Sequence, residues 1–124
     1  MTGQLPIYAI KADFFRVLGH PARVRILELL RDGEKTVGEL QAALELDSSG
    51  TSQHLAALRR LNIVEGRKVG TTARYSVRDA RMFELLEVAR QIISSGLAET
   101  TALLEELSVP EPRPISDGET PKAS

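Results

Sequence analysis

The 124-residue sequence has no cysteine and no tryptophan, and its only histidines are His20 and His54. The absence of cysteine excludes disulfides, thiol nucleophiles and thiolate metal sites, and it is typical of proteins in a reducing compartment. No apolar run approaches the roughly 20 residues that span a bilayer, and no secretory signal pattern is found. We therefore expect a cytoplasmic protein with no membrane partner, no metal and no other cofactor.

Aromatic residues are scarce, at 4% of the chain, so we expect an aliphatic core. The net charge of only −1 is unevenly distributed along the sequence. Residues 47–78 carry six basic and two acidic side chains, a net charge of +4, whereas residues 79–124 carry four basic and nine acidic side chains, a net charge of −5. A concentration of positive charge in one segment suggests a polyanionic partner such as nucleic acid.

Apolar spacing and capping residues predict four helices, then two strands, then a long helix. A capping box of Thr36 and Glu39 opens the third helix, and Asp47 or Ser48 caps the fourth. The first three predicted helices cover 7–18, 22–30 (with Pro21 in the first turn) and 36–45. The fourth runs from 48 to Arg59-Arg60, and the final helix runs from after Asp79 to about 107. The predicted hairpin between them covers 63–77. Four of the six prolines lie in 108–124, which we expect to be a disordered tail.

The fourth helix begins with small hydroxyl side chains, in the stretch SSGTSQHLAALRRL at 48–61. Thr51, Leu55 and Leu58 share one face, with Leu61 at its end, and we expect that face to be buried. The opposite face carries Ser49, Ser52, Gln53, Ala56, Arg59 and Arg60. Two helices joined by a tight turn, the second with a small polar outer face, have the outline of a helix-turn-helix.

Four motifs occur together in order: HPARVRIL (20–27), TVGEL (36–40), SQHLAALRRLNIV (52–64) and GRKVGTTARYSV (66–77). With them the chain resembles the ArsR/SmtB family of bacterial transcriptional repressors. The resemblance implies a winged helix-turn-helix fold, mainly α with a small β-hairpin. The first and last helices carry more apolar residues than such a domain needs to cover, so we expect it to dimerise through these terminal helices. The resemblance also implies a homodimer that binds a pseudo-palindromic double-stranded DNA operator and releases it when an effector arrives.

The chain departs from this family where many members sense metals. Residues 39–46 read ELQAALEL, without the cysteine pair that many members carry there, and residues 79–107 contain no histidine. Glu84 and Glu87 are three residues apart, but two exposed carboxylates are far from the six ligands that a hard cation prefers. We therefore predict metal-independent regulation, and the signal is left open between an organic small molecule, a partner protein and the protein's own level.

Candidate site residues follow from these placements. His54 lies beside Leu55, where a lone histidine is more often a packed, hydrogen-bonded residue, but it is also included among the DNA contacts. The candidate DNA-binding residues are Ser48, Ser49, Ser52, Gln53, His54, Arg59, Arg67, Lys68, Thr71, Thr72 and Arg74. The candidate dimer-interface residues are Tyr8, Phe14, Phe15, Leu86, Ala89, Ile93 and Leu97.

We expect residues 1–107 to form one DNA-binding and dimerisation domain. An enzyme is not expected, because Ser52 and His54, two apart on a helix, point to nearly opposite sides and cannot share a proton. Two alternatives remain: a small-molecule sensor on the winged-helix scaffold, and a protein–protein interaction module that has lost most of its DNA binding. The net charge of +4 over 47–78 argues against the second.

Overall fold

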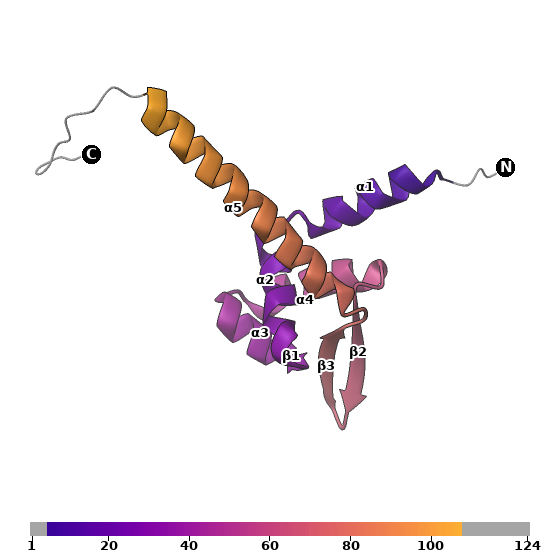
Figure 1. Ribbon diagram of the computed structural model, residues 1–124. Helices are drawn as coiled ribbons and strands as arrows, with labels where there is room; N and C mark the ends of the chain where they lie inside the picture. Colours follow the sequence, from indigo (N-terminus) through magenta and orange to yellow (C-terminus); the bar gives the residue numbers. More distant parts are fainter. Residues whose placement is uncertain (1–4, 108–124) are drawn as a thin grey trace, which may run out of the picture. The chain divides into compact units, whose positions relative to one another are not determined.

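A computed structural model describes residues 5–107, so the tail predicted at 108–124 lies outside the described residues. The elements confirm the predicted order of four helices, a hairpin and a final helix (Figure 1). They are α1 (Ile7–Leu18), α2 (Pro21–Leu29), the 3₁₀ turn η1 (Leu30–Asp32), β1 (Lys35–Thr36), α3 (Val37–Leu44), α4 (Ser48–Arg60), β2 (Val64–Val69), β3 (Thr72–Val77) and α5 (Arg81–Leu107). No described helix is long and apolar enough to cross a membrane.

Helices α3 and α4 each begin at a side-chain cap. Thr36 Oγ1 accepts from the Glu39 N–H at 3.1 Å, while Glu39 Oε1 accepts from the Thr36 N–H at 2.9 Å, which confirms the predicted capping box. At α4 the cap is Asp47 rather than Ser48, since its Oδ1 accepts from the Gly50 N–H at 2.7 Å. Each cap satisfies a backbone donor that the helix leaves unpaired.

The turn between α3 and α4 is only three residues long. It begins at Glu45, which lies in the left-handed region with φ 58°, and the Leu46 N–H then donates to the Gln41 carbonyl. This reversal sets α4 against α3, as in a helix-turn-helix. The pair confirms the motif that the sequence predicted.

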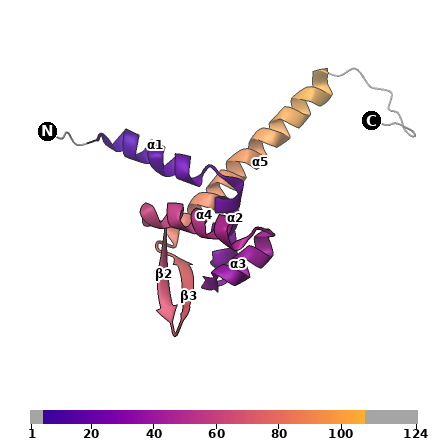
Figure 2. The same ribbon diagram turned by 180° about the vertical axis from the view of Figure 1, so that it is seen from behind.

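The sheet has three antiparallel strands in the order β1-β3-β2. Lys35 pairs with Tyr75 and Thr36 with Arg74, so β1 extends the predicted hairpin by one short strand. The sequence analysis missed β1, because two residues cannot show an alternating pattern. Beyond this short strand the β2–β3 hairpin projects away from the helices as a wing (Figures 1 and 2).

The core of residues 5–84 is aliphatic, as predicted, and lies where α2, α3 and α4 meet. Its fully buried side chains are Ile26, Leu27, Leu40, Leu55 and Leu58, together with Thr51. The Thr51 hydroxyl donates to the Asp47 carbonyl at 3.0 Å, so its burial leaves no unpaired donor. Helix α3 buries only Leu40 fully and leaves Ala43 exposed, while Arg23 of α2 is half-buried.

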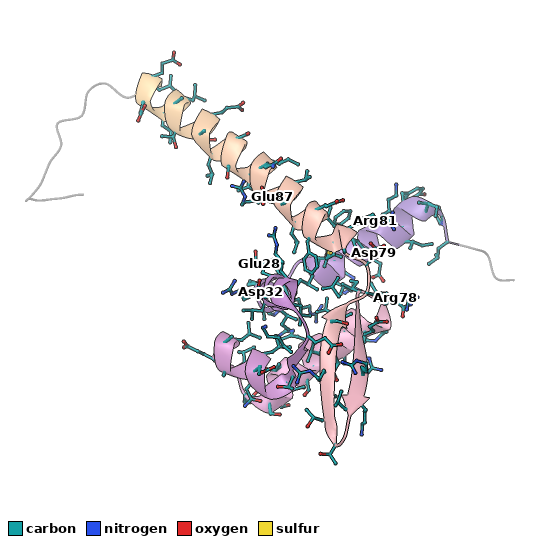
Figure 3. All side chains as sticks on the ribbon, turned by 60° about the horizontal axis from the view of Figure 1, so that its bottom comes forward. Glu28, Asp32, Arg78, Asp79, Arg81 and Glu87 are labelled. Carbon is teal, nitrogen blue, oxygen red and sulfur yellow. The ribbon has the colours of Figure 1, made fainter. Side chains whose placement is uncertain are left out.

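Residues from Leu85 onward form a second compact unit, which consists of the rest of α5 as far as Leu107. At the start of the helix, the Asp79 carboxylate accepts from the Arg81 N–H at 3.0 Å and also binds the Arg81 guanidinium, at 2.6 Å to Nη2 (Figure 3). These contacts lower the pKa of Asp79 to about 2. Asp79 therefore stays ionised just before α5, where a negative charge is favourable beside the N-terminus of a helix.

Candidate nucleic-acid interface

Helix α4 separates its two faces as the sequence predicted. Thr51, Leu55 and Leu58 are buried, whereas Leu61, which follows the helix, is only half-buried. The outer face of α4 (Ser49, Ser52, Gln53, Ala56, Arg59 and Arg60) is exposed to solvent. Ser48, in the first turn, is also exposed. Arg59 and Arg60 form no ion pair within residues 5–107, so both guanidinium groups are available to an external anion.

His54 lies between the two faces and is half-buried. Arg23 Nε donates to His54 Nδ1 at 3.2 Å, and the rings of His20 and His54 lie with centroids 4.3 Å apart. Arg23 also donates through Nη1 to the Val17 carbonyl at 3.1 Å, which links α4 to the end of α1. His54 is thus a packed, hydrogen-bonded residue, and the sequence missed Arg23 as its partner because 31 residues separate them.

Both histidines accept a hydrogen bond at Nδ1. His20 Nδ1 accepts from the Ala22 N–H at 3.1 Å as the cap of α2, and His54 Nδ1 accepts from Arg23. An imidazole that accepts at Nδ1 carries its proton on Nε2 when it is neutral. Among the described residues, no group of three or more His, Asp or Glu side chains could hold a metal ion.

The environment of His54 predicts a pH-dependent stability. Burial, His20 and Arg23 all lower its pKa from 6.5. His54 therefore binds a proton more readily in the unfolded chain than in the folded one. Its contribution to the free energy of unfolding is fully present above 6.5, the pKa in the unfolded chain, and is lost as pH falls from there through the lower pKa of the folded protein. We expect the melting temperature to decrease between about pH 7 and about pH 5, and to decrease less in His54→Gln. Thermal unfolding followed by circular dichroism would measure this; equal slopes for both proteins would contradict it.

The wing carries the remaining candidates. Thr71 lies in the turn after Gly70, whose φ is 66°, and Thr72 begins β3; both threonines and Lys68 are exposed. Arg67 and Arg74 are directly opposite each other in the β2–β3 register. Lys68 forms no ion pair within the part of the chain that the structure describes. Among the candidate wing cations Arg67, Lys68 and Arg74, Lys68 is therefore the one without an ion pair to a described residue.

Arg67 and Arg74 are not free. Arg67 binds the Glu34 carboxylate through Nη2 at 2.6 Å and Nε at 3.1 Å, and Arg74 Nε lies 3.6 Å from the same carboxylate. Hydrogen bonding from Arg67 lowers the pKa of Glu34 and raises that of Arg67. The sequence analysis missed Glu34, which is 33 residues from Arg67 and leaves no local signal.

The candidate dimer residues are only partly covered. Tyr8 and Phe15 are exposed on α1, and Phe14 is half-buried with its ring edge-on to Phe15 at 5.4 Å. On α5, Leu86 and Ala89 are half-buried, while Ile93 and Leu97 are exposed. Further exposed apolar side chains are Leu5, Ile7 and Ile10 near and on α1, and Val88, Ile92, Leu103, Leu104 and Leu107 on α5.

The helix pair α3–α4, with the β2–β3 wing beside it, defines a winged helix-turn-helix protein. Residues 20–66 match the family model described as bacterial regulatory protein, arsR family. An uncharacterized HTH-type transcriptional regulator of Mycobacterium tuberculosis, Rv0081, is 45% identical over 103 residues, which cover 82% of this chain and 90% of that protein. The chain belongs to the ArsR family of transcriptional regulators.

Solved structures agree with this assignment. The crystal structure of M. tuberculosis Rv0081 superposes with a TM-score of 0.74 at 42% identity, covering 79% of this chain and 99% of that one. The Vibrio cholerae transcriptional activator HlyU is 36% identical over 62% of this chain and 71% of its own. A homodimeric winged helix-turn-helix DNA-binding domain from Mycobacterium bovis, Mb0332, has a TM-score of 0.67 at 26% identity over 80% of this chain and 95% of that one. The relatives are regulators and not enzymes, as the sequence predicted.

Proposed function

We propose that this protein is a cytoplasmic, homodimeric repressor that binds a pseudo-palindromic operator in double-stranded DNA. The observation that carries the proposal is the outer face of α4, which combines small polar side chains with the unpaired Arg59 and Arg60. Such a face can enter the major groove and donate to base edges and phosphates. The homodimeric DNA-binding domain of Mb0332 supports the assembly.

In this proposal, Ser48, Ser49, Ser52 and Gln53 contact bases or phosphates from the first turns of α4. Two copies of α4 would lie in successive major grooves, about 34–36 Å apart. Arg59 and the wing residues Lys68, Thr71 and Thr72 would bind phosphate and fix the register. His54 would stabilise the position of α4 through Arg23 and add little contact of its own.

Candidate residues on α1 and α5 supply the dimer interface of the proposal. Four large apolar side chains are exposed to solvent in the single chain: Tyr8, Phe15, Ile93 and Leu97. Dimerisation would bury each of these side chains against the partner chain. Residues 1–107 would then act as one functional domain.

An electrophoretic shift with DNA from upstream of the protein's own coding sequence tests the proposal. We expect a specific complex that competitor DNA of random sequence does not displace. A protein that binds neither DNA would instead be the interaction module. A specific complex that raises transcription would make it an activator, as HlyU is named.

Two single substitutions separate base contacts from phosphate contacts. Gln53→Ala should change which operator variants are preferred, with a cost of about 1–3 kcal/mol at the base that Gln53 reads. Lys68→Ala should weaken binding to all sequences and reduce the slope of log K against log salt concentration by about 1. Fluorescence anisotropy with a panel of operator variants at several salt concentrations measures both. If Lys68→Ala instead loses the preference among operator variants and leaves the salt slope unchanged, Lys68 contacts a base and not a phosphate.

Release of DNA should not depend on zinc, nickel, cadmium or arsenite. The chain has no cysteine, and both imidazoles use Nδ1 as acceptors. Titration of the protein–operator complex with each metal, with and without chelator, checks this. A stoichiometric, chelator-reversible loss of binding at micromolar zinc would contradict it. The proposal leaves the signal open between an organic ligand, a partner protein and autoregulation.

A further inference from the structure

Two arginines of the wing share one carboxylate. Arg67 on β2 and Arg74 on β3 are directly opposite each other, an arrangement in which like charges repel. Glu34, just before β1, relieves this repulsion by binding Arg67 and lying 3.6 Å from Arg74 Nε. Glu39 adds a second carboxylate, with Oε1 at 3.9 Å from Arg74 Nη2. The cluster of these four side chains has no net charge.

The contact between Glu34 and Arg67 uses the geometry by which arginine binds phosphate. Nε and Nη2 of one guanidinium donate to the two oxygens of one anion, at 3.1 and 2.6 Å. Arginine forms the same two-pronged contact with a phosphate group. A phosphate can therefore take these two donors of Arg67 only if the Glu34 carboxylate leaves them.

Glu34 is held in this position by its backbone. Gly33, immediately before it, has φ 131°, which an L side chain rarely adopts. The Glu34 carbonyl accepts from Arg74 Nη2 at 3.5 Å, and the following two residues pair with β3. The Glu34 backbone is thus attached to the sheet that carries both arginines, and the Glu34 side chain is 32% exposed, against 62% for that of Arg67.

We propose that Glu34 is a specificity-determining residue that acts as an internal phosphate mimic. It occupies Arg67 and Arg74 in the free protein and on random DNA. The two arginines reach phosphate only where base contacts from α4 hold the wing against the DNA backbone long enough for a phosphate to displace the Glu34 carboxylate. Sequence-independent affinity then comes from Lys68, Arg59 and Arg60, which form no ion pair among the described residues. This inference rests on the proposed DNA binding.

Glu34→Gln tests the inference, because glutamine keeps the shape and removes the charge. We expect it to bind a random-sequence duplex of about three helical turns roughly three- to tenfold more tightly than the wild type at low salt. Its preference for the upstream fragment over the random duplex should fall by a similar factor. Fluorescence anisotropy with both duplexes at several salt concentrations gives both values.

Glu65→Gln is the matched control. Glu65 lies on β2 two residues before Arg67, is exposed, and lies 4.0 Å from Arg78 and not from the arginine pair. Glu65→Gln also removes one negative charge, so only a gain in random-DNA affinity beyond that of Glu65→Gln supports the inference. In a background of Arg67→Gln and Arg74→Gln, Glu34→Gln should raise the affinity for random DNA no more than Glu65→Gln does.

Two results would overturn the inference: unchanged or weaker binding of random DNA by Glu34→Gln, or an effect no larger than that of Glu65→Gln. Weaker binding would make Glu34 a residue that orients the arginines toward phosphate. Equal melting temperatures for wild type and variant would show that folding is not the cause. If the wild type binds neither duplex, the proposed function itself fails, which is a different result.

Discussion

Ile93→Glu should convert the protein to a monomer and weaken operator binding by about 10²- to 10⁴-fold, because two tethered half-site contacts become one. Ile93 is 60% exposed in the single chain, so the new carboxylate costs the isolated fold little. In a dimer it would be buried without a partner charge, which is strongly unfavourable. Sedimentation at micromolar concentration measures the assembly, and anisotropy measures operator binding.

Ser95→Glu is the control for this change. Ser95 is exposed on the same helix, two residues further along, where α-helical geometry directs it to nearly the opposite side. It adds the same charge and should leave both the dimer and the operator complex intact. Loss of the dimer in Ser95→Glu, or a monomeric wild type, would show that the interface does not lie on the Ile93 side of α5.

Local signals were enough to predict most of the fold. The bounds of α1 follow from its apolar spacing and from Gly19 after Leu18, and the capping box of α3 is a contact between residues three apart. The buried and outer faces of α4 were predicted because helical periodicity alone separates them. Each of these features depends on residues that are close together in sequence.

Features that depend on distant residues were not predicted. Glu34 meets arginines 33 and 40 residues away, and Arg23 meets His54 across 31 residues. No periodicity marks such pairs, because their contacts exist only after α2, α4 and the hairpin have packed. This changes the site: Arg67 and Arg74 stand out in the sequence as free cations, whereas the structure pairs both with Glu34.

The basic side chains at the proposed interface are therefore of two kinds, those without an ion pair and those paired with Glu34. In the proposal, Lys68, Arg59 and Arg60 bind any phosphate within reach, because they form no ion pair among the described residues, and they would set the affinity for DNA of any sequence. Arg67 and Arg74 have a competing anion in the protein itself. A salt titration of the wild type should accordingly show fewer phosphate contacts on random DNA than the count of basic residues over 47–78 suggests.

Ser52→Glu should reduce binding to both operator and random DNA by about 100-fold, because it places a carboxylate on the outer face of α4, where phosphates would approach. Ser52 is exposed and lies within the second turn of the helix, so the substitution removes no core contact. The melting temperature and the dimer should be unchanged, unlike the effect of Ile93→Glu. Ser95→Glu again provides the control, since it makes the same substitution at an exposed helical position away from α4. Anisotropy with both duplexes measures the loss. If Ser52→Glu binds DNA as well as Ser95→Glu does, the outer face of α4 does not meet DNA, and the wing alone would have to account for any binding.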